Sequence, residues 1–133
     1  MKILLLAVVH LLITETSAQA TNVISSHVLD IASGRPAVGV HTTAFFLNDH
    51  NQWILVGNSL TDSSGRIANV HQGHQLLEGQ YQLHFDTGPY FANHGMSTFY
   101  PYIKVVFDVY NSSQHYHVPI TLSNYGYSTY RGQ

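Results

Sequence analysis

The sequence has no cysteine and few charged residues, and both features limit the kinds of function that the protein can have. Without cysteine the chain cannot form disulfides, and neither a thiolate nucleophile nor a thiolate metal ligand is available. Lys and Arg together number 5 and Asp and Glu 7, for a net charge of -2, with both signs spread along the chain. We therefore expect no surface that binds nucleic acid or an anionic membrane.

Long hydrophobic runs are also missing, apart from one at the N-terminus. Met1-Lys2 is followed by an apolar run from Ile3 to Ile13 and then by Ala18-Gln-Ala20. This order is typical of a secretory signal peptide, and the run is shorter than the ~20 residues of a membrane span. We expect residues 1–20 to be removed, and residues 21–133 to form one domain of an exported protein.

Alternation of apolar and polar residues dominates the rest of the chain, which predicts an all-β domain. Between Tyr102 and Tyr110 every second residue from Ile103 to Val109 is apolar, as in a half-buried strand. Turn-forming stretches, Asp86-Thr-Gly-Pro89 among them, separate it from six other predicted strands: Ile24–Leu29, Val40–Leu47, Trp53–Leu60, Arg66–Val70, Gln80–Asp86 and His115–Leu122. A helix of one or two turns is expected only near Gln72–Leu77. Many short strands favour a sandwich or a barrel.

Three histidines are candidates for chemistry. His115 and His117 are two apart on a predicted strand, so their side chains face the same way, ~7 Å apart along it. Such a pair suits a proton relay, an oxyanion-binding site, or two ligands of a metal that needs a further ligand. His27 lies early in the first predicted strand. Taken alone, either motif is at least as compatible with an ordinary polar strand face.

An arginine and the C-terminal segment are the other candidates. Arg66 follows the turn Asp62-Ser-Ser-Gly65, and a guanidinium suits bidentate recognition of carboxylate or imide oxygens. Tyr125–Gln133 holds three tyrosines and Arg131, unlike the loosely constrained polar ends of most chains, so we expect it to be docked. No G-x-S-x-G elbow or phosphate-binding Gly loop is present, which favours water, held by His and Arg, as the nucleophile of any hydrolytic reaction.

Taken in order, these segments resemble the 5-hydroxyisourate hydrolase branch of the transthyretin-like family. The resemblance covers nearly all of residues 21–133 and is carried by Ser26-His-Val-Leu-Asp30, Gly34-Arg-Pro-Ala-Val-Gly-Val40, Thr61-Asp-Ser-Ser-Gly-Arg66, Phe85-Asp-Thr-Gly-Pro-Tyr-Phe91, Phe99-Tyr-Pro-Tyr102, His115-Tyr-His-Val-Pro119 and Tyr125-Gly-Tyr-Ser-Thr-Tyr-Arg-Gly132. The Tyr-Arg-Gly ending is the most specific of them, because thyroid-hormone-binding transthyretins lack it.

The resemblance implies a transthyretin-like, eight-stranded β-sandwich with one short helix, assembled as a homotetramer with sites between dimers. The implied reaction is hydrolysis of 5-hydroxyisourate, a product of urate oxidation, to 2-oxo-4-hydroxy-4-carboxy-5-ureidoimidazoline, with no cofactor and no obligatory metal. Catalytic roles are implied for His27, Arg66 and His117, and substrate-binding roles for His27, Arg66 and Tyr130; His115 is an accessory candidate.

One departure keeps other functions open. The chain ends in Gln133 where family members usually end in Ser, so an amide replaces a hydroxyl that has been given a role in the site, and Gln133 becomes a second accessory candidate. The alternatives are a non-enzymatic module that binds an aromatic ligand, and an exported protein that binds a metal through His27, His115 and His117. The resemblance to exported bacterial members predicts a periplasmic location.

Overall fold

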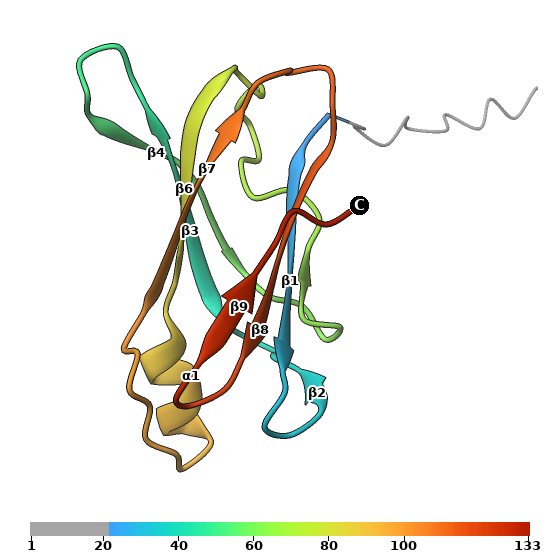
Figure 1. Cartoon of the computed structure of the whole chain (residues 1–133), viewed down its shortest axis with the longest axis vertical. Coiled ribbons are helices and arrows are strands. Elements are labelled where there is room, and N and C mark those ends of the chain that lie inside the picture. The colour runs from blue at the N-terminus through green and yellow to red at the C-terminus, as the bar shows by residue number, and fades with distance from the viewer. Residues whose placement is uncertain (1–21) are drawn as a thin grey trace, which may run out of the picture.

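The computed structural model describes residues 22–133, which form a β-sandwich with one short helix (Figure 1). The predicted signal peptide, residues 1–20, lies outside the described residues. Within residues 22–133, no helix has the length and hydropathy that a membrane crossing requires. The prediction of an all-β sandwich is confirmed.

Two sheets make up the sandwich. The first sheet has the order β2-β1-β8-β9, with β5 also pairing with β1, and the second has the order β4-β3-β6-β7. All strand pairs are antiparallel except β1 with β8, which is parallel. The strands are β1 (Ile24–Asp30), β2 (Arg35–Pro36), β3 (His41–Leu47), β4 (Trp53–Leu60), β5 (Arg66–Ile67), β6 (Gly79–Phe85), β7 (Ile103–Val109), β8 (Tyr116–Leu122) and β9 (Tyr127–Thr129).

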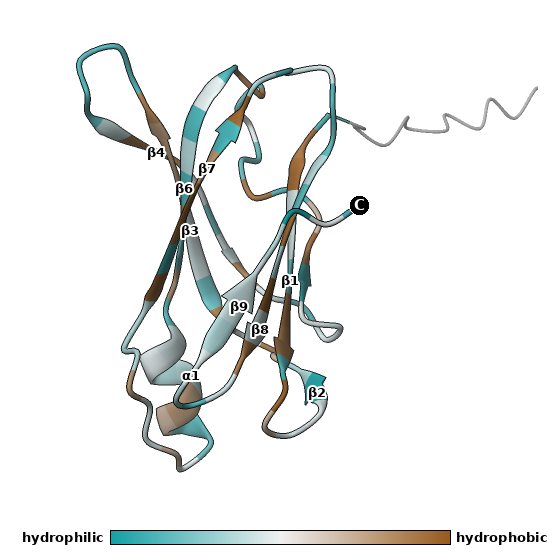
Figure 2. Cartoon of the chain, in the orientation of Figure 1, coloured by the Kyte–Doolittle hydropathy of each residue, from teal (hydrophilic) through white to brown (hydrophobic). Residues whose placement is uncertain are grey.

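The core lies between the sheets because alternate side chains of each strand point inward. Figure 2 shows apolar stretches interrupted by polar ones along the strands. Ile24 and Val28 of β1, Leu83 and Phe85 of β6 and Ile120 of β8 are almost completely buried. The intervening residues of β1 and β8 therefore face outward, away from the second sheet.

The helix is the main correction to the sequence prediction. It is α1 (Thr87–Asn93), whereas the predicted helix near Gln72–Leu77 is wrong: that stretch forms turns, with Gly73 at a φ of 82°. The composition of Asp86-Thr-Gly-Pro89 predicts a turn between strands. Pro89 instead lies in the first turn of α1, where backbone N–H groups have no partner within the helix, so its missing N–H costs nothing there.

The predicted strand Arg66–Val70 ends after Ile67 in the structure. Beyond Ile67, the Ile24 N–H of β1 has a side-chain acceptor instead of a backbone oxygen. It donates to Nε2 of the buried His71 at 3.0 Å. The other predicted strands agree with the structure to within one or two residues. Two short strands, β2 and β9, escaped prediction because alternation cannot be recognised over two or three residues.

Candidate active site

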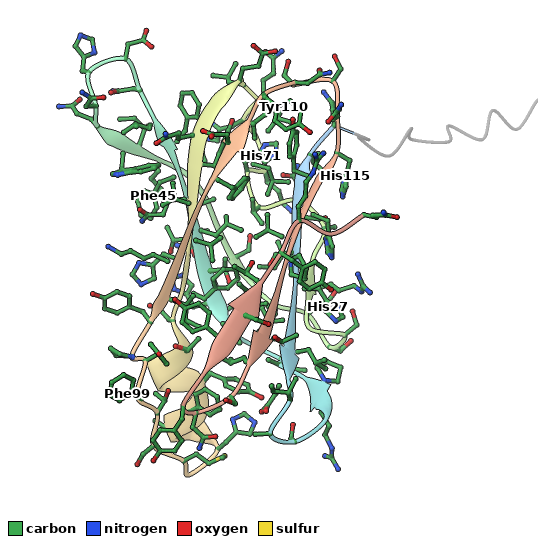
Figure 3. The ribbon with its side chains drawn as sticks, viewed as in Figure 1. His27, Phe45, His71, Phe99, Tyr110 and His115 are labelled. Carbon is green, nitrogen blue, oxygen red and sulfur yellow. The ribbon has the colours of Figure 1, made fainter. Side chains whose placement is uncertain are left out.

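A cavity of about 690 Å³ lies on the outward side of the first sheet, over β1, β5 and the start of β8. Ser25, Arg66, His115 and His117 are among the residues that line it. Figure 3 shows His27 and His115 on this side of the molecule, with Phe45 of the second sheet on the opposite side. The structure thus brings together an arginine and two of the three histidines identified from the sequence.

The turn before β5 fixes the backbone that carries Arg66. Oδ1 of Asp62 accepts from the backbone N–H groups of Ser64 and Arg66, each at 2.9 Å, and from Oγ of Ser64 at 2.7 Å. The Arg66 N–H, followed by the two Ser64 donors, keeps the pKa of the Asp62 carboxyl below its usual range. Gly65 has a φ of 75°, and a Cβ there would lie 2.5 Å from the carbonyl oxygen of Val28. The sequence of this turn is therefore dictated by its geometry.

His27 lies directly across from Arg66 in the pairing of β1 with β5. Its Nε2 is 3.0 Å from the backbone oxygen of Ser64. A carbonyl oxygen only accepts hydrogen bonds, so Nε2 carries the proton and Nδ1 of a neutral ring keeps a free lone pair. The same turn that positions Arg66 therefore selects the tautomer of His27.

His117 and His115 meet at one hydroxyl group. Oγ of Ser25 is 2.7 Å from Nδ1 of His117 and 2.9 Å from Nε2 of His115, and the two rings are stacked with centroids 6.5 Å apart. Burial of the His117 ring, then the charge of Arg66 and the neighbouring His115 and His27, lower its pKa below the usual 6.5. His117 is therefore neutral at pH 7, as a general base must be.

The C-terminal segment, which the sequence predicted to be docked, lies against His117. The Gly132 N–H donates to the His117 backbone oxygen at 2.8 Å, and a Cβ on Gly132 would lie 2.5 Å from Cδ2 of the His117 ring. The Arg131 guanidinium lies over the rings of Tyr110 and Tyr116, at 5.4 Å and 4.8 Å from their centroids, and donates to the Tyr110 hydroxyl. Arg131 anchors the segment, and Gly132 lets it approach the histidine ring.

Tyr130 does not line the cavity that contains Arg66. It borders a second cavity of about 220 Å³, together with β7 residues such as Phe107 and with His117, which lines both cavities. Gln133 is exposed. Within one chain, His117 thus separates Tyr130 from Arg66, and the predicted substrate-binding role of Tyr130 stays a prediction.

The metal-binding alternative requires His27, His115 and His117 to lie close enough to share one ion. In the part of the chain that the structure describes, no three His, Asp or Glu side chains are grouped as a metal site. His115 and His117 instead share Ser25, and His27 binds the Ser64 carbonyl. Sequence reasoning missed Ser25, although it precedes His27 by two residues and so shares its face of the strand.

The contact of Gly132 with His117 leads to a testable prediction. We expect Gly132→Ala to displace either the C-terminal segment or the His117 ring and to lower activity at least about tenfold, because misplacement of a proton-transferring group is costly. Steady-state kinetics of the hydrolysis that the resemblance implies would measure this loss. Gly126→Ala is the matched control, since the nearest atom to its Cβ is Ser123 Oγ at 3.8 Å. Equal activity of the two variants would contradict the prediction.

Comparison with known proteins places these observations in a family. The HIUase/Transthyretin family model matches residues 24–132. A probable 5-hydroxyisourate hydrolase of Caenorhabditis elegans is 47% identical over 115 residues, which are 86% of this chain and 84% of that protein. The structure of Klebsiella pneumoniae 5-hydroxyisourate hydrolase is 32% identical with a TM-score of 0.71, over 83% of this chain and 98% of the other. Sparus aurata transthyretin is 28% identical with a TM-score of 0.78, over 84% and 97%.

Proposed function

The chain belongs to the HIUase/transthyretin family, and we propose that it hydrolyses 5-hydroxyisourate to 2-oxo-4-hydroxy-4-carboxy-5-ureidoimidazoline in urate degradation. The observation that carries the proposal is the cavity in which Arg66 and a neutral His117 meet, with His27 paired to Arg66 at its edge. This combination offers a cation for an oxygen-rich ring and lone pairs that can accept a proton from water.

The proposed reaction adds water to a ring carbonyl and breaks the adjacent C–N bond. Arg66 donates to the carbonyl oxygen and stabilises the negative charge that develops there. Nε2 of His117 accepts a proton from the attacking water, and Nδ1 of His27 helps to orient this water. When the C–N bond breaks, the leaving nitrogen takes a proton, which the same His117 nitrogen returns. Water is the nucleophile in this proposal, and none of its steps requires a metal.

The first experiment measures the decay of freshly generated 5-hydroxyisourate with and without purified protein. We expect acceleration by the wild-type chain and an about 10²-fold smaller acceleration by His27→Ala, because the variant lacks a group that orients the water. His50→Ala is a suitable control because His50 is exposed in the turn between β3 and β4. No acceleration by the wild type would overturn the proposed function, whereas wild-type rates in His27→Ala would overturn only the assignment of His27.

A second candidate function is a binding module for an aromatic ligand without catalysis. The TM-score of 0.78 to Sparus aurata transthyretin favours it. The Tyr130-Arg-Gly132 segment argues against this candidate. Its Gly132 lies against the ring of His117, and thyroid-hormone-binding transthyretins lack such an ending. Saturable binding of an aromatic ligand by a protein that leaves the decay of 5-hydroxyisourate unchanged would support this second candidate.

The lowered pKa of His117 leads to a prediction about pH. The neutral form of His117 is favoured in the folded protein, so we expect it to stay neutral below pH 6.5 and to lose its lone pair only as the pH falls through the lowered pKa. Activity should persist into the same acidic range. In Arg66→Ala one of the causes of the shift is removed, and the pKa of His117 should rise. Histidine NMR titrations of both proteins would measure this directly, and identical His117 titrations would contradict it.

We propose a homotetramer with sites shared between dimers. In the part of the chain that the structure describes, the edge strands β7 and β9 pair on one side only, and exposed Val106, Tyr110 and Tyr130 lie on or next to them, as expected of surfaces that pair with another copy. In such an assembly Tyr130 reaches a site that is built from two chains. Native mass spectrometry would test the proposal, and a monomer at the enzyme concentration of the assay would contradict it.

We propose export to a bacterial periplasm after removal of residues 1–20. The charged start, short apolar run and Ala18-Gln-Ala20 support export. The bacterial type stays a prediction, since the relative with 47% identity is from a nematode. Expression in a Gram-negative host followed by fractionation and N-terminal sequencing would test it. We expect a periplasmic protein that begins at Thr21; a full-length cytoplasmic product would contradict the proposal.

A further inference from the structure

We infer that Ser25 and His115 form a proton relay behind His117, so that a proton taken from water at His117 is passed through Ser25 to His115. The inference rests on the proposed hydrolytic function. It starts from three groups that contact one another in sequence: Nδ1 of His117, Oγ of Ser25 at 2.7 Å, and Nε2 of His115 at 2.9 Å from that Oγ. Ser25 is a positioning residue here, since it acts through His117.

A single hydroxyl between two imidazoles constrains both rings. The Ser25 hydroxyl has one proton, so it can donate to only one of the two nitrogens. The nitrogen that receives this bond must be unprotonated, and the other nitrogen must carry a proton that it donates to Oγ. The tautomers of His115 and His117 are therefore coupled: when one ring presents a lone pair to Ser25, the other presents an N–H.

Catalysis selects one of the two arrangements. Nδ1 of His117 is occupied by Ser25, so Nε2 is the only nitrogen of this ring left to accept a proton from water. Nε2 is unprotonated in a neutral ring only if Nδ1 carries the proton. His117 then donates from Nδ1 to Ser25, and Ser25 donates to Nε2 of His115. In the opposite arrangement His117 has no free lone pair and cannot act as a base.

The transfer is balanced in protons and bonds. As an O–H bond of water breaks and the bond from Nε2 of His117 to this hydrogen forms, the Nδ1 proton of His117 moves to Oγ and the hydroxyl proton moves to Nε2 of His115. His117 remains neutral with its proton on Nε2, and His115 becomes a cation. When Nε2 of His117 gives its proton to the leaving nitrogen, the two transfers through Ser25 run backward and His115 becomes neutral again.

Charge and burial favour this route over protonation of His117 itself. An imidazolium at His117 would be partly buried and would face the positive charge of Arg66, both of which disfavour it. His115 is exposed, so water can solvate the charge there. Groups near this end of the cavity include Asp62 and Arg66, which line it, and His27, which pairs with Arg66. Pairing of β1 with β8 sets Ser25 beside His117 and fixes the relay in rigid strands.

The test compares Ser25→Ala, which removes the hydroxyl, with Ser25→Thr, which keeps it. We expect Ser25→Ala to lower kcat about 10²-fold with KM changed less than about twofold, and Ser25→Thr to restore most of the rate. Proton inventories in mixtures of H₂O and D₂O should be curved for the wild type, because several protons move together, and linear for Ser25→Ala. Exogenous imidazole should raise the rate of His115→Ala, since His115 is exposed.

Nitrogen-15 NMR of the histidine rings tests the relay separately from the reaction. In the free protein we expect a protonated Nδ1 on His117 and an unprotonated Nε2 on His115, and loss of both preferences in Ser25→Ala. Ser26→Ala is the matched control, because the hydroxyl of Ser26, the next residue of the same strand, donates to the Val118 backbone oxygen at 2.8 Å and not to a histidine ring. It should lower stability but leave the tautomers and the inventory unchanged.

The outcomes separate the two proposals. Wild-type protein that does not accelerate 5-hydroxyisourate decay would overturn the proposed function, while the NMR result would still report on the hydrogen-bonded chain. An active wild type with a linear proton inventory, or a Ser25→Ala variant with the tautomers and rate of the wild type, would overturn the relay alone.

Discussion

Replacing Arg66 with alanine is expected to lower kcat/KM for 5-hydroxyisourate by about 10²–10³-fold, the usual effect of removing one stabiliser of a developing oxyanion. Arg66 is the cation of the cavity that also contains His117, and its backbone is fixed by the Asp62 carboxylate rather than by its own side chain. The fold should therefore survive the change. Steady-state kinetics together with a thermal melt would separate lost catalysis from lost structure.

Two further substitutions sharpen this prediction. Arg66→Lys keeps the charge but loses the planar pair of donors, so it should recover only part of the activity. Arg35→Ala serves as the matched control, because Arg35 is an exposed arginine in β2, paired with the backbone of Asp30. Activity of Arg66→Ala equal to that of Arg35→Ala would remove Arg66 from the mechanism.

The sequence was sufficient to predict the sandwich and most of the residues that could serve catalysis. Long alternating segments such as Ile103–Val109 specify a strand and its buried face by themselves. The turn Asp62–Arg66 is equally local, since its hydrogen bonds join residues at most four apart. Local patterns of this kind can be read without knowledge of the fold.

What escaped prediction depends on pairing between distant segments. Ser25 contacts His115 and His117, about ninety residues later, only because β1 and β8 run parallel in one register. The surroundings of Tyr130 are another case. Arg131 and Gly132 hold the segment over His117, and Tyr130 borders the cavity that β7 residues line, not the cavity that contains Arg66. The position of a residue in the sequence does not show which distant segment its side chain will lie beside.

The prediction of where the helix lies failed for a different reason. Asp86-Thr-Gly-Pro89 has the composition of a turn, and the same residues also suit the first turn of a helix. Tertiary contacts decide between the two: Thr87 is buried with its hydroxyl donating to Tyr100, and Tyr90 donates to the buried carboxylate of Asp30 at 2.7 Å. The helix is stable because it packs against β1 and the segment before β7.

The largest expected loss of stability comes from Gly57→Ala in β4. A Cβ at this position would lie 1.6 Å from the backbone oxygen of Val70 and 2.7 Å from its carbonyl carbon, far closer than atoms can approach. The obstacle is backbone, so no side-chain rotation relieves it. The Val70 segment cannot retreat either, since Val70 donates to the Ile24 oxygen at 2.9 Å and His71 accepts from the Ile24 N–H.

We therefore expect Gly57→Ala to lower the free energy of unfolding by about 4 kcal/mol or more, a large share of the ~5–15 kcal/mol of a typical domain. Urea denaturation would measure the loss, with Gly126→Ala as the control at a glycine that has room for a methyl group. The same clash should push Ala68 and Asn69, which line the Arg66 cavity, out of place, so activity should fall before global unfolding. If Gly57→Ala had the same denaturation midpoint as Gly126→Ala, the prediction would be contradicted, because the Val70 backbone would then make room for the methyl group without loss of stability.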